Sequence, residues 1–187
     1  MLVHWKKLTS RIIHKNPWWS YVLDTFTIPR GIEGEYHYIH SNGSSMIIPV
    51  LDDGRIVLVN QFRYLRRMES IEFPCGGVKA GHSYEEMAQL ELEEEAGYMA
   101  MSWENAGEFN PFNGATDEMC RVFVARGLSP VAPKPEATEE FEILRMTPDE
   151  IEKMIAERSI WDGMSLAAWT LVRHQFLGEQ STMNNQQ

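Results

Sequence analysis

The stretch from Glu72 to Tyr98 constrains this chain more than any other, because it joins a glycine-rich loop to a short acidic helix. A short apolar run leads into three glycines, at positions 76, 77 and 81. Ser83 stands three residues before Glu86, which is the spacing of a capping box at a helix N-terminus. Gly97 predicts the end of this helix, since glycine readily takes the positive φ at which a last turn unwinds.

The last turns of the predicted helix carry an unusual density of negative charge, from Glu91, Glu93, Glu94 and Glu95. Three of these, at positions 91, 94 and 95, share one side of the helix, where like charges cost about 0.2–0.5 kcal/mol a pair. The helix dipole also disfavours anions at this end. A hard divalent cation such as Mg²⁺ would offset both penalties by taking carboxylate oxygens. On charge and spacing alone, a solvated acidic face remains equally open.

The whole stretch resembles the Nudix box of the Nudix hydrolases, whose pattern is Gx5Ex7REUxEExGU with U an aliphatic residue. The positions that match this pattern are Gly76, Glu91, Leu92, Glu94, Glu95 and Gly97. Two positions depart from it, since His82 stands where the family has Glu and Leu90 where it has Arg, and Tyr98 is a loose fit to the closing aliphatic. The glutamates and both glycines keep the family's spacing, which makes the resemblance specific.

A wider part of the chain, from about Asn16 to His174, resembles the ADP-ribose and nucleoside-diphosphate-sugar pyrophosphatases of that superfamily. The segments that carry this resemblance are 16–18, 53–55, 61–64, 72–74 and 124–128. It implies an α/β/α sandwich with a mixed sheet, which agrees with predicted strands interleaved with three helices. It also implies a small N-terminal β-rich subdomain that helps to build a homodimer and part of the nucleoside pocket.

Local patterns give the remaining elements and the domain limits. The first fifteen residues fit a helix or a strand equally well, and a hairpin is predicted around the turn at 29–31. Further strands are predicted at 46–51, 55–62, 103–109, 119–125 and 141–146, and further helices from Thr147 and over about 162–176. We expect a subdomain at 1–42, the Nudix domain at 43–180 and a disordered tail at 181–187.

Composition limits the possible partners and the compartment. The net charge of −10 over 187 residues argues against nucleic-acid polymers, including capped RNA, because these are bound mainly through positive surface. No apolar run approaches the roughly 20 residues of a membrane helix, and the N-terminus lacks the apolar core of a secretory signal. Two cysteines, Cys75 and Cys120, provide no disulfide framework, which fits a cytoplasmic protein.

The metal site is predicted at Glu91 and Glu95, which lie one turn apart, with Glu94 alongside. The expected ion is Mg²⁺, for which Mn²⁺ could substitute. The resemblance adds the backbone carbonyl of the residue before the first glycine, here Cys75. It also implies a general base on a loop before a late strand. There Glu140 is marginally preferred to Glu139, while positions 136 and 142 are less well placed.

Two further residues are predicted to contact the substrate. Arg63 is the candidate for clamping phosphate, because a guanidinium can meet phosphate oxygens bidentately. Trp18 could stack on the nucleobase or could equally be a buried aromatic of the small subdomain. Arg66 and Arg67 are better explained as solvated charges.

Together these observations predict a metal-dependent hydrolase that cuts the pyrophosphate bond of a nucleoside diphosphate sugar such as ADP-ribose or GDP-mannose. The products would be a nucleoside monophosphate and a sugar phosphate. The alternative is a nucleotide-sugar-binding regulator with a Nudix fold and weak or lost catalysis. His82 and Leu90 favour the regulator slightly, whereas retention of the acidic cluster favours the enzyme, since a binder has no need of mutually repelling carboxylates.

Overall fold

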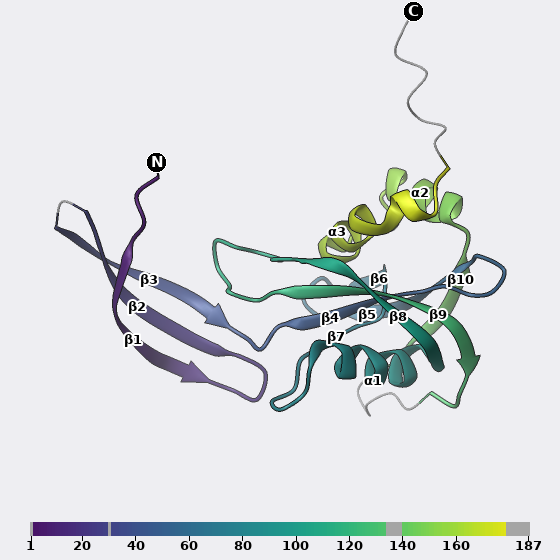
Figure 1. Cartoon of the computed structure of the whole chain (residues 1–187), viewed down its shortest axis with the longest axis horizontal. Coiled ribbons are helices and arrows are strands. Elements are labelled where there is room, and N and C mark those ends of the chain that lie inside the picture. Colours follow the sequence, from purple (N-terminus) through teal and green to yellow (C-terminus); the bar gives the residue numbers. More distant parts are fainter. Residues whose placement is uncertain (1, 30, 134–139, 179–187) are drawn as a thin grey trace, which may run out of the picture.

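The computed structural model describes residues 2–29, 31–133 and 140–178. The N-terminal part is an antiparallel sheet of three strands in the order β1 (Lys6–Lys15), β2 (Ser20–Ile28) and β3 (Ile32–His40). Figure 1 shows this sheet projecting away from the rest of the chain. The first fifteen residues, whose sequence fitted a helix or a strand equally well, thus contain the strand β1. This strand pairs with β2 along its whole length. All ten residues of β1 are exposed. Neither face of the strand is buried, so the sequence lacks the alternation of apolar and polar residues that would identify a strand.

The rest of the chain is built on two neighbouring sheets. One has the order β7 (Cys75–Gly77), β4 (Ser44–Pro49), β9 (Cys120–Pro130) and β8 (Tyr98–Phe109). In this sheet β4 and β9 are parallel and the other pairs are antiparallel, which makes it the predicted mixed sheet. The other sheet is antiparallel, in the order β10 (Glu142–Met146), β5 (Ile56–Arg63) and β6 (Met68–Glu72). A bridge between Val50 and Ile56 links the two.

Helices cover both faces of these sheets, which confirms the predicted α/β/α sandwich. In Figure 1, α1 (Tyr84–Ala96) lies on one side, and α2 (Pro148–Ala156) and α3 (Gly163–Val172) lie on the other. A short 3₁₀ helix, η1 (Arg173–Gln175), follows α3 directly. None of the described helices has the length and apolar character needed to cross a membrane.

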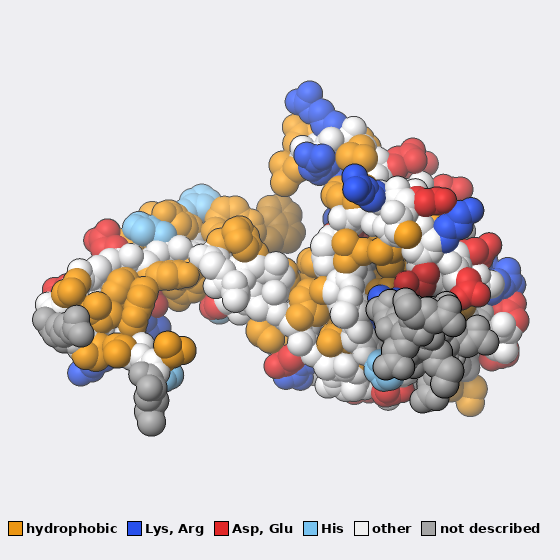
Figure 2. Space-filling view, turned by 90° about the horizontal axis from the view of Figure 1, so that it is seen from above, with side chains coloured by type: hydrophobic (Ala, Val, Ile, Leu, Met, Phe, Trp, Pro, Cys, Tyr) orange, Lys and Arg blue, Asp and Glu red, His pale blue; other side chains and the backbone are white. Residues whose placement is uncertain are grey.

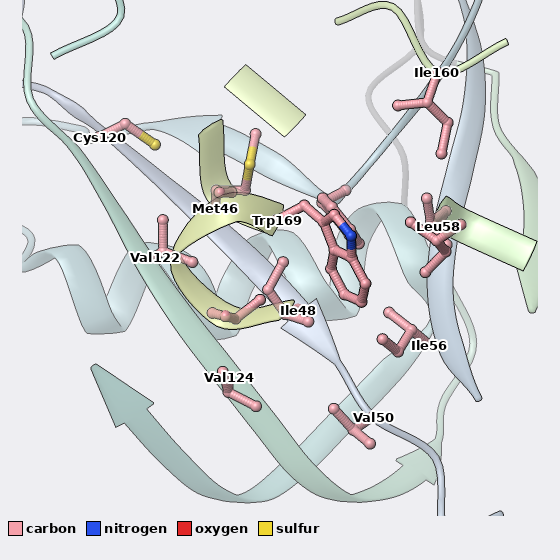
Figure 3. Close-up of a cluster of buried hydrophobic side chains, with 14 residues drawn as sticks. Met46, Ile48, Val50, Ile56, Leu58, Cys120, Val122, Val124, Ile160 and Trp169 are labelled. Carbon is pink, nitrogen blue, oxygen red and sulfur yellow. The ribbon is translucent and has the colours of Figure 1, made fainter. Parts of the chain in front are cut away.

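The core lies between β4, β9 and the two C-terminal helices. Side chains of alternate residues in β4 point to opposite faces. Met46 and Ile48 therefore pack around Trp169 of α3, whereas Ile47 packs on the α1 side. Figure 3 shows the first cluster, with Ile48 and Ile56 near the Trp169 indole and Val122 and Val124 on β9 farther from it. The four residues of β5 from Ile56 to Val59 are fully buried, as their continuous apolar run predicted.

Local signals predicted the limits of α1 and the start of α2 correctly, whereas α3 ends at Val172, before the predicted limit near 176. Ser83 and Glu86 form the expected capping box, and Gly97 closes α1 with φ of +70°. Thr147 caps α2 with a second capping box, and a proline occupies the first turn. The strands β6 and β7 were not predicted, because their short sequences read as an apolar run leading into a loop. Only pairing with β5 and β4 makes them strands. Residues 181–187, where a disordered tail was predicted, lie outside the described residues.

Candidate active site

The C-terminal half of α1 lies against β7, and this contact assembles the predicted acidic site. Glu95 is only 6% exposed, and its Oε2 accepts a hydrogen bond of 3.1 Å from the backbone N–H of Cys75. A backbone donor of this kind stabilises the ionised carboxylate and fixes its direction. The structure therefore brings Glu95 and Cys75 together although twenty residues separate them in the sequence.

Glu91 lies one turn before Glu95 in the same helix, and its carboxylate packs against the backbone of Gly76. A Cβ added at Gly76 would stand 1.9 Å from Oε1 of Glu91, a distance that no real contact permits. Glycine is thus required here for the close approach of a carboxylate. This is a physical reason for the first glycine of the box. Gly77, the next residue, has nothing within 4 Å of its added Cβ.

The donor set formed in this way consists of hard oxygen atoms. Glu91 and Glu95 bracket the Cys75–Gly76 backbone, and the half-buried Glu94 makes no hydrogen bond or ion pair with another described residue. Among the described residues, no three metal-ligating side chains form a cluster. Mg²⁺ needs no such cluster, because it keeps several waters and uses one or two carboxylates together with substrate phosphates. The arrangement therefore fits Mg²⁺.

The thiol of Cys75 takes no part in this donor set. A hydrogen bond with Cys120, burial, and the nearby carboxylates of Glu95 and Glu91 raise the pKa of Cys75 well above its ordinary value. The thiol therefore stays neutral at physiological pH. A neutral thiol is a poor ligand for a hard cation. If Cys75 contributes to metal binding, it does so through its backbone carbonyl, as the family resemblance implied.

Arg63 is engaged within the protein. Its Nε donates a 2.7 Å hydrogen bond to Oε1 of Glu72, and its Nη2 donates to Oε2 of the same carboxylate. Glu72 is 2% exposed and also accepts a bond of 3.4 Å from Nε2 of Gln61. The hydrogen bonds to Glu72 raise the pKa of Arg63 above its usual value. One edge of the guanidinium is thus occupied, and only the remaining N–H groups could meet a phosphate.

The role of Glu72, which neutralises Arg63, was not predicted from the sequence. A signal was present, since Glu72 is an acidic residue immediately before Phe73 in a run of buried side chains. Buried carboxylates are rare unless a cation partners them. The partner could not be identified, because it depends on the register of β5 against β6.

Trp18 lies in the turn between β1 and β2 with 79% of its surface exposed. Its backbone N–H donates to Oδ1 of Asn16 at 2.9 Å, which holds the turn. The alternative that Trp18 is a buried aromatic is therefore wrong. An exposed indole remains available for stacking on a nucleobase, and that role stays a prediction.

Of the two candidate bases, only Glu140 lies among the described residues, and no hydrogen bond or ion pair links its side chain to the described carboxylates of α1. Glu140 is exposed and lies two residues before the short strand β10, whereas Glu139 lies outside the described residues. Within β10, Glu142 accepts a hydrogen bond of 3.2 Å from Asn60 of the neighbouring strand. The two departures from the box are also on the surface, with His82 exposed in the loop before α1 and Leu90 37% exposed on the helix.

Comparison with known proteins shows what the chain is similar to. A family model described as NUDIX domain matches residues 41–164. The chain is 29% identical over 170 residues to the ADP-ribose pyrophosphatase of Bacillus subtilis (strain 168), covering 87% of this chain and 92% of that protein. It is 28% identical over 148 residues to the methanol dehydrogenase activator of Bacillus methanolicus, covering 78% and 80%.

A solved structure described as an ADP compounds hydrolase superposes with a TM-score of 0.80. The superposition covers 91% of this chain and 93% of that one, at 18% sequence identity. At this identity the likeness concerns the fold alone.

Proposed function

The chain belongs to the Nudix family, and from this premise we propose that it is a Mg²⁺-dependent hydrolase of the pyrophosphate bond in nucleoside diphosphate sugars. The proposal rests chiefly on one observation, the placement of Glu91 and Glu95 on the Cys75–Gly76 backbone. The name of the Bacillus subtilis relative, which is an ADP-ribose pyrophosphatase, supports the choice of substrate class.

The proposed reaction is the addition of water across a phosphoric anhydride. The water oxygen bonds to one phosphorus atom while the bridging P–O bond breaks, and the bridging oxygen leaves on the other phosphate. A nucleoside monophosphate and a sugar phosphate result. Mg²⁺ held by Glu91 and Glu95, with Glu94 and the Cys75 carbonyl alongside, would neutralise the phosphate charge that repels a nucleophile.

A carboxylate on the loop before β10 is proposed to take the proton from the attacking water. Glu140 is the first candidate because it stands at the described entrance of that strand, and Glu139 is the second. A positioned base contributes about 10²–10⁴-fold to rate. We therefore expect Glu140→Gln or Glu139→Gln to lower kcat while substrate binding changes little. Wild-type kcat in the double variant would exclude this loop as the source of the base.

Two side chains are proposed to hold the substrate. Arg63, held in place by Glu72, would offer its remaining N–H groups to a phosphate oxygen. Trp18 would stack on the base, as exposed aromatic faces do. Both roles place the substrate between the N-terminal sheet and the carboxylate site.

We further propose that residues 1–42 form a subdomain that pairs two copies of the chain, with residues 43–180 as the hydrolase domain. Five Lys and Arg against three Asp and Glu give residues 1–40 a charge of +2, while twelve against twenty-four give the remainder −12. Large apolar groups are exposed here, including Ile12 in β1 and Trp5 just before it, and Figure 2 shows hydrophobic side chains spread along this sheet. A basic, apolar surface of this kind complements the acidic body of a second copy.

The pairing is tested by light scattering of the full chain against a Trp5→Ser, Ile12→Ser variant. We expect a dimer for the unmodified chain and a monomer for the variant. A dimer that survives these changes would show that β1 is not part of the interface.

A second candidate function is regulation of another enzyme through nucleotide binding. It is favoured by 28% identity to a methanol dehydrogenase activator and by the two departures from the box. The two candidates separate in a substrate panel containing ADP-ribose and GDP-mannose with Mg²⁺, in which products are identified by phosphorus NMR. The hydrolase proposal expects turnover that EDTA stops and that Mg²⁺ or Mn²⁺ restores. Calorimetric binding without turnover would favour the regulator, and chelator-insensitive turnover would contradict the metal site.

A further inference from the structure

A cavity lies at the N-terminal end of α1, away from the acidic site. Its volume is about 310 Å³, and its lining comes from the first turn of α1 and from β8 and β9, namely Ser83, Tyr84, Glu85, Trp103, Asn105, Arg121 and Phe123. Tyr84 precedes Glu91 by seven residues, which corresponds to about 10 Å along a helix. The cavity is thus separate from the carboxylates that bracket Gly76.

The first turn of α1 forms one side of the cavity, and β8 and β9 form the other. Trp103 and Asn105 share one face of β8, and Phe123 pairs with Asn105 from β9. A bulge follows at Gly107, whose φ is +118°. The extra residue brings Glu108 opposite Arg121, so that the two strands present an ion pair at this edge of the cavity.

Arg121 is oriented in advance by two contacts. Its Nε donates to Oε2 of Glu108 at 3.0 Å, and its guanidinium carbon lies 4.4 Å from the centre of the Tyr84 ring. Tyr84 is itself fixed, because its carbonyl accepts a 2.7 Å bond from Ser45. A Cβ added at Gly43 would reach within 2.2 Å of the Tyr84 hydroxyl. A guanidinium held over a ring loses little freedom when a ligand arrives.

The remaining walls supply an aromatic surface and hydrogen-bond donors. Trp103 is partly buried and meets Phe123 edge-on, with ring centres 6.4 Å apart and planes at 78°. Among the described residues nothing accepts a hydrogen bond from the Trp103 indole N–H. Asn105 uses its Oδ1 to accept from Gly107 at 3.0 Å, which leaves its amide N–H₂ as a donor. Glu85, exposed at the rim, is an acceptor.

From these features we propose that the cavity is a binding site for the base of a nucleoside, independent of hydrolysis. A nucleobase is flat, and its ring nitrogens and carbonyls accept hydrogen bonds while its exocyclic amino group donates one. The base would contact Trp103 and Arg121. It would accept hydrogen bonds from the indole N–H and from the amide of Asn105, and it would donate one to Glu85. The volume lies at the lower end of the range for small-molecule pockets, which suits a nucleoside better than a dinucleotide.

The test is a titration of the full chain, labelled with 5-fluorotryptophan and free of Mg²⁺, with adenosine. The six tryptophans give separate fluorine resonances, and Trp103→Phe identifies the one from the cavity. We expect a saturable shift of the Trp103 resonance. D-Ribose and inorganic phosphate should leave it unmoved, and an equal shift with either would overturn recognition of the base.

Arg121→Gln should weaken adenosine binding at this resonance at least tenfold. Arg126→Gln is the matched control, because Arg126 is a second β9 arginine that lies over an aromatic ring, with Phe176 at 5.5 Å. Asn105→Ala provides an independent variant if Arg121→Gln does not fold, and it should weaken binding at least threefold. A shift confined to the Trp18 resonance, or a Trp103 shift unchanged in these variants, would overturn the proposal.

Discussion

Glu72 and Glu95 are both buried carboxylates, yet their surroundings differ. Glu72, 2% exposed, is matched by the guanidinium of Arg63 through two hydrogen bonds. Glu95, 6% exposed, accepts from a backbone N–H and shares its side of α1 with Glu91. Burial is thus nearly the same for the two groups, whereas the first is neutralised by a side chain and the second stands in a concentration of negative charge.

The difference shows how structural and chemical carboxylates can be separated. Removing a buried charge that a cation matches leaves the cation uncompensated, so the cost falls on stability. Removing one carboxylate from a group of like charges relieves their repulsion, but it weakens the binding of any cation that these carboxylates hold. We therefore expect Glu72 substitutions to affect unfolding and Glu95 substitutions to affect turnover.

The largest expected effect is that of Glu95→Gln on rate. The change keeps the side-chain size and removes one negative charge from the proposed metal site. We expect kcat to fall by about 100- to 1,000-fold, the scale of losing a major electrostatic stabiliser, while the free energy of unfolding is unchanged or higher. Glu157→Gln, an exposed position at the end of α2, is the control and should retain full activity. Normal turnover by Glu95→Gln would remove Glu95 from the site.

Arg63→Met should have the next largest effect, mainly on stability. The variant keeps an apolar stem but leaves the Glu72 carboxylate buried without its cation. Breaking a buried pair costs about 3–5 kcal/mol, and we expect about 2–3 kcal/mol here because the Arg63 side chain is 46% exposed. Urea unfolding measures the loss.

Glu72→Gln should cost less than Arg63→Met, about 1 kcal/mol, since the guanidinium that remains can turn to water. An equal loss of unfolding free energy in Glu72→Gln and Arg63→Met would contradict this explanation. It would show that access of the remaining partner to water does not determine the cost of breaking the pair.

Gly76→Ala tests whether the position of Glu91 matters for rate. The added methyl would collide with the Glu91 carboxylate and push it off the β7 backbone. We expect a loss in kcat of about 10- to 100-fold, since small misplacements of catalytic groups are costly. Gly77→Ala is the control, because open space surrounds its added Cβ. If both variants keep the wild-type kcat, the contact between Glu91 and Gly76 does not contribute to catalysis.

His82→Glu should have the smallest effect. It restores the box residue in an exposed loop, where a single extra charge contributes about 1 kcal/mol at most through water. The Mg²⁺ concentration for half-maximal rate should therefore fall by no more than about fivefold, as measured by titrating activity against Mg²⁺. An unchanged metal dependence would place residue 82 outside the reach of the site.

Much of the fold could be predicted because its signals are local. The capping boxes at Ser83 and Thr147 and the closing glycine at Gly97 act within one turn, so the sequence contains their whole cause. The apolar run from Ile56 to Val59 likewise predicted a strand buried on both faces. The presence of Glu91, Glu94 and Glu95 on the last turns of α1 was predictable for the same reason, since helix spacing alone sets which residues are neighbours.

The sequence by itself thus determined the family, the acidic helix and the residues that could bind a metal. Tertiary structure alone decided that Arg63 is held by Glu72, that Glu91 lies on Gly76, and that β1 is a strand. It also decided that Trp103 and Arg121 share a cavity. Each of these depends on strand register or on where a helix begins over a sheet. Such relations join distant residues through the packing of the whole chain, which no local pattern encodes.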